Sequence, residues 1–186
     1  GDFPVFENTP YTLTYSKNEM QSIQQNFKGK YLTNKAANFK NFSNNAANYS
    51  ILHLSTHADA GDIITPSTIK FYDQDILYSE LYQLNIHPDL VVLSACETGI
   101  GKLFKGEGAM SISRGFQLAG AQNILLSLWK VNDYTTSVFM DSFYQNIKKV
   151  YPNSSWNLYE LYFSQNTKDL NDKKIESNDR SQWDKA

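Results

Sequence analysis

The sequence predicts an α/β fold with a mostly parallel central sheet and helices on both faces. Short apolar runs with polar or turn-like borders alternate along the chain with longer segments of helical periodicity. Strands that alternate with helices join through right-handed crossovers, which place the helices against the sheet. The chain has 186 residues, 41% of them hydrophobic and 19% charged, so one folded domain is expected and wholesale disorder is excluded.

Three runs are the clearest predicted strands: residues 49–56 (YSILHLST), 90–95 (LVVLSA) and 123–129 (NILLSLW). Compact apolar runs of this length are typical of strands buried on both faces of a parallel sheet. Weaker strand candidates are residues 11–15, 30–33 and 69–72.

Five segments between and after these strands favour helices. Residues 17–27 carry Met20, Ile23 and Phe27 on one helical face, and residues 35–42 could begin behind an Asn34 cap. The others are residues 108–118, 134–149 behind a possible Asp133 cap, and the aromatic-rich stretch 156–170. The polar stretch 171–186 is expected to be a frayed terminus.

Charge and cysteine content exclude several functional classes. The formal net charge is −2, so no global basic field favours direct nucleic-acid binding. Cys96 is the single cysteine, which excludes an internal disulfide and a cysteine-rich zinc site. No apolar run approaches the roughly 18 residues that span a membrane, and no secretory signal is visible, so we expect a cytoplasmic protein that does not enter membranes.

Two of the three clear strands end in reactive side chains. His57 follows the run ILHLST, and Cys96 ends the stretch LVVLSAC. The carboxyl ends of parallel strands form the ligand crevice of such a sheet, so neighbouring strands would bring this thiol and imidazole together as in a Cys/His hydrolase. Taken singly, a lone cysteine is more often a small buried residue, and a histidine at a strand end a polar boundary residue. The small residues around Cys96 and His57 favour a catalytic role, because they let a substrate backbone approach.

These motifs resemble the CHAT family, caspase-like domains often attached to tetratricopeptide repeats within the caspase, separase and gingipain class of cysteine peptidases. The matching residues are ILHLSTHA (51–58), DLVVLSACETGIGKLFKGEGAMSISRGFQLAGAQNILLSLWKVND (89–133) and the helix that follows. The resemblance covers residues 11–170 approximately. It implies a caspase-like three-layer sandwich.

The resemblance also implies roles for individual residues. Cys96 would be the nucleophile and His57 its partner, with an oxyanion hole formed by backbone N–H groups near Ala58 and at Cys96. Neither a cofactor nor a metal is expected. The segment Trp129-Lys130-Val131-Asn132-Asp133 looks like the W-x-V-x-D segment of separases, in which the aspartate binds a basic residue before the scissile bond. Asp133 would therefore select arginine or lysine; the structural alternative, helix capping, is compatible with that role.

The sequence excludes a phosphate-binding loop and a zinc site formed by two histidines. In TGIGKL the first glycine of a phosphate-binding loop would be Cys96, and Leu103 replaces the required serine or threonine. His53 and His57 are four residues apart, but within a predicted strand this spacing separates them too far for joint zinc binding.

We expect residues 1–186 to form a single peptidase domain that is a piece of a longer protein. Family members usually have further sequence before this region and a closing strand after a tryptophan near position 183. The leading hypothesis is a cysteine endopeptidase that acts on a protein or peptide substrate in bacterial defence or signalling, activated by a partner protein or a tetratricopeptide-repeat module. An inactive CHAT-like scaffold is the main alternative, and an unrelated α/β hydrolase or transferase using Cys96 is a third.

Overall fold

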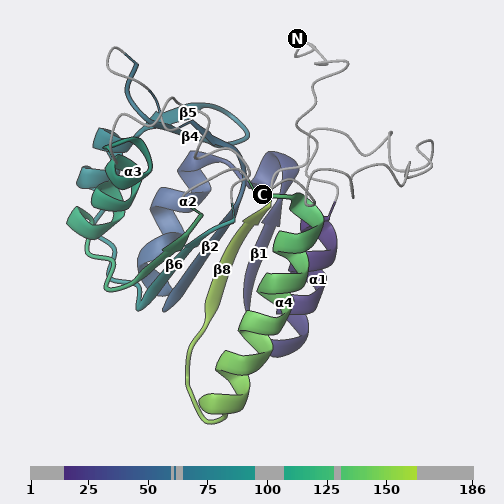
Figure 1. Cartoon of the computed structure of the whole chain (residues 1–186). Coiled ribbons are helices and arrows are strands. Elements are labelled where there is room, and N and C mark those ends of the chain that lie inside the picture. The colour runs from purple at the N-terminus through teal and green to yellow at the C-terminus, as the bar shows by residue number, and fades with distance from the viewer. Residues whose placement is uncertain (1–14, 60, 62–64, 95–106, 128–130, 163–186) are drawn as a thin grey trace, which may run out of the picture.

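A five-stranded parallel sheet forms the centre of the protein (Figure 1). The computed structural model describes residues 15–59, 61, 65–94, 107–127 and 131–162. The strand order is β1-β8-β2-β6-β7, and all four pairings are parallel. The strands are β1 (Gly29–Thr33), β8 (Leu158–Tyr162), β2 (Ile51–Ser55), β6 (Leu90–Leu93) and β7 (Ile124–Leu126).

Helices cover both faces of this sheet, which confirms the α/β prediction. The helices α1 (Ser16–Asn26) and α4 (Asp133–Val150) pack against each other on one face. The other face carries α2 (Phe39–Asn45), α3 (Glu107–Leu118) and the 3-10 helix η3 (Tyr78–Gln83) (Figure 1). Two short 3-10 turns, η1 (Asn34–Ala36) and η2 (Ala46–Asn48), flank α2.

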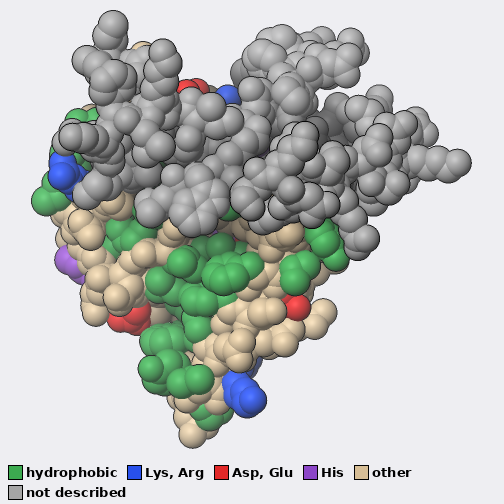
Figure 2. All heavy atoms as spheres, viewed as in Figure 1, with side chains coloured by type: hydrophobic (Ala, Val, Ile, Leu, Met, Phe, Trp, Pro, Cys, Tyr) green, Lys and Arg blue, Asp and Glu red, His purple; other side chains and the backbone are tan. Residues whose placement is uncertain are grey.

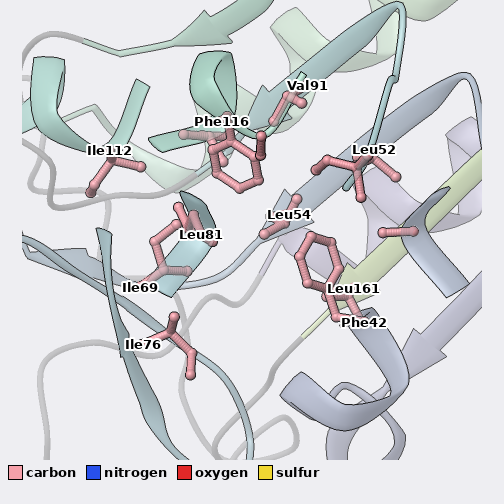
Figure 3. Close-up of a cluster of buried hydrophobic side chains, with 14 of the residues drawn as sticks. Phe42, Leu52, Leu54, Ile69, Ile76, Leu81, Val91, Ile112, Phe116 and Leu161 are labelled. Carbon is pink, nitrogen blue, oxygen red and sulfur yellow. The ribbon is translucent and has the colours of Figure 1, made fainter. Parts of the chain in front are cut away.

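Alternate residues of each strand belong to two separate apolar cores. Leu52 and Leu54 of β2 lie in the core toward α2 and α3, where Phe42 and Phe116 are fully buried (Figure 3). Ile51 belongs to the second core, with residues of α1 and α4. Because β2 is buried on both faces, every one of its five residues is buried, as its unbroken apolar run predicts.

A small antiparallel sheet begins directly after β2. It contains β3 (Ala58–Asp59), β4 (Thr68–Lys70) and β5 (Asp75–Leu77). The weak strand candidate at 69–72 corresponds in part to β4, and the candidate at 30–33 corresponds to β1. The candidate at 11–15 lies outside the described residues, except for Tyr15. This second sheet therefore fixes the chain immediately beyond the carboxyl end of β2.

The predicted helix over residues 156–170 is wrong in its described part. Residues 158–162 form β8, which lies between β1 and β2 in the sheet. Leu158, Tyr159, Glu160 and Leu161 are all buried because a central strand is covered on both faces. In so short a segment, the spacing of apolar residues does not separate a buried strand from a helix, and the aromatic residues here favour the strand.

The two predicted helix caps are also shifted. Residues 34–36 form η1, and Asn38, not Asn34, caps the following helix by accepting the Asn41 N–H at 2.8 Å. At the start of α4, Asn132 accepts the Thr135 N–H at 3.2 Å, so Asp133 is the first helical residue and not the cap. The predicted helices at 17–27, 108–118 and 134–149 correspond to α1, α3 and α4.

Candidate active site

The carboxyl ends of β2, β6 and β7 lie side by side, because these strands are consecutive neighbours in the parallel sheet. Leu54 of β2 is the register partner of Leu93 of β6. His57 follows Leu54 by three residues, and Cys96 follows Leu93 by three. Cys96 itself lies outside the described residues. The strands that lead to His57 and Cys96 are therefore adjacent and parallel, and the two residues follow the same register pair at the same distance in sequence.

His57 connects β2 with the small antiparallel sheet and is half-buried. Its carbonyl oxygen accepts the Lys70 N–H at 2.9 Å. One residue earlier, the Thr56 hydroxyl donates to the Lys70 carbonyl at 2.6 Å. These two bonds to β4 hold the backbone of the predicted histidine at a defined place beside the sheet edge.

Ala58, the predicted oxyanion-hole residue, is buried and opens β3. It is the register partner of Ile69 in antiparallel pairing. Hydrogen-bonded and non-bonded pairs alternate in such a ladder. The bond from Lys70 to His57 makes that pair the bonded one, so the N–H of Ala58 points away from β4.

Asp133, the predicted specificity residue, lies half-buried at the start of α4. Its Oδ2 atom accepts the backbone N–H of Tyr15 at 2.7 Å. The rings of Tyr15 and Tyr134 also meet edge to face, with centroids 5.1 Å apart. The carboxylate is thus oriented by Tyr15, which immediately precedes α1. Trp129 and Lys130, which precede it in the matched motif, lie outside the described residues.

A buried polar cluster lies beneath the strand ends, between the sheet and helices α1 and α4. The Nε2 atom of His53 is 2.7 Å from the Glu19 carboxylate, and its Nδ1 atom is 2.8 Å from the Tyr144 hydroxyl. The Nε2–H group of His53 is not aligned with the Glu19 oxygen as in a regular hydrogen bond. The contact between His53 and Glu19 is therefore electrostatic. The Ser94 hydroxyl donates to the other Glu19 oxygen over a longer 3.3 Å.

The charge state of His53 follows from these neighbours. Burial alone would lower the pKa of the imidazole, because a dry site disfavours its cation. The close contact with Glu19 and the charges of Glu19 and Glu160 outweigh that effect and raise the pKa of His53 above its ordinary value. The neighbours of His53 therefore favour its charged form beside the buried Glu19 side chain.

Glu160 of β8 is the register partner of both His53 and Tyr31, and it is fully buried. Burial, assisted by the nearby charge of Glu19 and opposed by that of His53, raises the pKa of Glu160 to about 8. Neither carboxyl oxygen has a hydrogen-bond partner among the described residues. At neutral pH this side chain is mostly protonated.

Sequence reasoning missed this cluster. The spacing of His53 and His57 bears only on metal binding, and no group of three or more described His, Cys, Asp or Glu side chains could hold a metal ion. One signal was present: Glu19 lies four residues before Ile23, on the same helical face as the apolar residues. An acidic residue at such a position indicates a buried partner.

Comparison with known proteins identifies the family-level relationship. The family model described as "CHAT domain" matches residues 5–158. Mouse tetratricopeptide repeat protein 28 is 32% identical over 95 residues, which is 50% of this chain and 4% of that protein. The chain thus corresponds to a small part of that relative's length. In the described part of the structure, no helix is long and apolar enough to cross a membrane.

Proposed function

Because this chain belongs to the CHAT family of caspase-like domains, we propose that it is a cysteine endopeptidase with a Cys96/His57 dyad. The observation that carries this proposal is the register of β2 and β6. Leu54 and Leu93 are partners in adjacent parallel strands, and the histidine and the cysteine each follow after the same three residues. A common sheet edge for both side chains is what a thiol–imidazole pair requires.

In the proposed reaction, the Cys96 thiolate attacks the scissile carbonyl carbon and forms a thioester acyl-enzyme. A free cysteine has a pKa near 8.5 and is mostly protonated at neutral pH, so His57 accepts its proton. The same imidazole then donates that proton to the departing amine, and water hydrolyses the thioester. The N–H of Ala58, directed away from β4, would stabilise the oxyanion together with the N–H of Cys96.

Asp133 is the proposed binding residue for an arginine or lysine before the scissile bond. It begins α4, which follows β7, and β7 is the second strand from β2 in the sheet. A contact between its carboxylate and a guanidinium would be charge-assisted and could be bidentate. The bond from the Tyr15 N–H supports this role because it fixes the orientation of the carboxylate.

The proposed setting is a cytoplasmic defence or signalling system in which a partner activates the peptidase. The name of the mouse relative suggests that a tetratricopeptide-repeat module is the partner. An inactive scaffold is the second candidate, and the dyad motifs in the sequence favour the enzyme over it.

Alkylation by an electrophilic peptide with arginine at its reactive end tests the dyad. Wild-type protein should form a covalent adduct at Cys96, Cys96→Ala should form none, and His57→Ala should react at least tenfold more slowly. The experiment is repeated with the partner protein present. A wild-type protein that does not react under either condition supports the scaffold.

A peptide library varied at the residue before the scissile bond tests Asp133. Wild-type enzyme should prefer arginine or lysine, and Asp133→Asn should lose that preference. Asp141→Asn is the matched control, because Asp141 lies on the same helix and bonds Ser22. Equal preferences in the wild type and in Asp133→Asn would remove the pocket role.

A further inference from the structure

One buried carboxylate contacts both strands that lead to the proposed dyad. The Oε1 atom of Glu19 is 2.7 Å from His53 of β2, and its Oε2 atom accepts the hydroxyl of Ser94, which directly follows β6. His53 precedes His57 by four residues, and Ser94 precedes Cys96 by two. The Glu19 side chain therefore links the two segments just before they leave the sheet.

The surroundings shield this link from water. Glu19, His53 and Ser94 are each at most 5% exposed, so water does not compete for their contacts. Tyr144 of α4 holds the second ring nitrogen of His53. Its own ring packs edge to face on Phe27, with centroids 5.6 Å apart. The imidazole is thus held from both helices that cover this face of the sheet.

We propose that Glu19 is a positioning residue, whose carboxylate holds the ends of β2 and β6 in a fixed relation and so places His57 and Cys96 for reaction. This inference rests on the proposed peptidase function. Glu19 has no part in the chemistry itself. A displacement of about 1 Å between reacting groups can cost roughly a hundredfold in rate, so a modest loosening of this link should be visible in kcat.

Glu160 supplies the matched control. It is buried in the same cluster and is also a glutamate, but it lies on β8, and its carboxyl oxygens form no hydrogen bond among the described residues. Its raised pKa, about 8, leaves it mostly uncharged at pH 7. Glu160→Gln therefore replaces one neutral side chain by another of the same shape.

Two variants weaken the link in different ways. Ser94→Ala removes the contact to the β6 side and leaves the Glu19–His53 pair in place, so it should fold. Glu19→Gln keeps the shape of the side chain and removes its charge. At pH 7 we expect kcat to fall about tenfold in Ser94→Ala and ten- to a hundredfold in Glu19→Gln, with KM within about twofold of wild type. Glu160→Gln should retain wild-type kcat.

Hydrogen exchange gives a readout that does not depend on activity. In Glu19→Gln and Ser94→Ala, backbone amides at 55–58 and 93–94 should exchange about tenfold faster, whereas those of β1 and α3 should not change. Glu160→Gln should exchange like wild type in both regions. The effects of the two link variants should also be non-additive in the double variant, because both act on one contact.

The outcomes separate this inference from the proposed function. Unchanged exchange at both strand ends in folded Glu19→Gln and Ser94→Ala would overturn the positioning role, whether or not the protein is a peptidase. A loss of kcat in Glu160→Gln equal to that in Glu19→Gln would overturn it too, since a general effect of buried polar residues would then explain the data. Faster exchange in a protein that never alkylates at Cys96 would support the link and reject the peptidase.

Discussion

The imidazole of His53 lies 2.7 Å from the carboxylate of Glu19, and both side chains are almost completely buried. In the neighbouring strand, the register partner of His53 is Glu160, whose carboxyl oxygens have no hydrogen-bond partner among the described residues. A buried ion pair adds little net stability, because desolvation offsets the attraction between the charges, but removal of one partner costs about 3–5 kcal/mol. The cluster therefore makes the stability of the protein depend on its protonation state.

Stability should fall as the pH rises from about 5 to about 8. The ordinary pKa of Glu160 is 4.5 and the folded-state pKa is about 8, so the folded protein holds a proton that the unfolded chain has lost between these values. The stabilising contribution of the protonated form is complete below pH 4.5 and is lost as the pH passes through 8, at about 1.4 kcal/mol per pH unit. The raised pKa of His53 acts in the same direction above its ordinary value of 6.5.

Urea unfolding of wild type and Glu160→Gln at pH 5.5, 7 and 8.5 measures this effect. The variant cannot lose a proton at this position, so its advantage over wild type should grow by roughly 1 kcal/mol per pH unit. Groups that are not coupled to Glu160 titrate alike in both proteins and cancel in the difference, so the comparison reports Glu160 together with His53. Parallel stability curves would contradict the assignment of a raised pKa to Glu160.

Tyr144→Phe should lower the free energy of unfolding by about 1–3 kcal/mol. The Tyr144 hydroxyl lies 2.8 Å from His53 Nδ1, and its loss leaves that buried nitrogen without its partner. Tyr151→Phe is the matched control, because Tyr151 is 54% exposed and its change should fall within about 0.5 kcal/mol. Equal effects of the two variants would show that the hydroxyl contact contributes nothing.

The sequence predicted the sheet well where local pattern and tertiary position agree. The runs around β2, β6 and β7 are apolar because these strands are covered on both faces, and α1 shows a clear helical stripe. Strand order did not follow from pattern. β8 enters between β1 and β2 although it is last in the described chain, and this long-range placement leaves no local signal at residues 156–162.

The candidate site was predictable to a different extent. The apolar runs predicted that a strand precedes each of His57 and Cys96, but not that the two strands are neighbours. The pairing of Leu54 with Leu93 shows that they are. The contacts of Glu19 with His53 and Ser94 were not predictable, because Glu19 and His53 are 34 positions apart in sequence and meet only through packing of α1 on the sheet. The one local indication was that Glu19 lies on the apolar face of its helix.

Gly120→Ala should destabilise the protein by about 1–3 kcal/mol. Gly120 lies two residues beyond the end of α3 and has a φ of +111°, and a Cβ atom there would lie 2.1 Å from the Ile86 carbonyl oxygen. The bonds from Gly120 N–H to Gln117 and from Ala121 N–H to Phe116 close the helix end in a Schellman arrangement. Thermal unfolding with exposed Gln122→Ala as the control measures the cost, and a wild-type melting temperature would contradict it.

Asn132→Ala and Asp133→Asn should separate helix capping from substrate recognition. Asn132 caps α4 through the Thr135 N–H, so its truncation should lower the free energy of unfolding by about 1 kcal/mol and leave the arginine or lysine preference unchanged. Asp133→Asn keeps an oxygen that can accept the Tyr15 N–H and loses the favourable charge at the helix start, worth about 0.3–1 kcal/mol, and it should also lose the preference. Urea unfolding and the peptide library measure the two effects on the same samples. A loss of preference in Asn132→Ala as large as that in Asp133→Asn would mean that the start of α4, and not the Asp133 carboxylate, determines specificity.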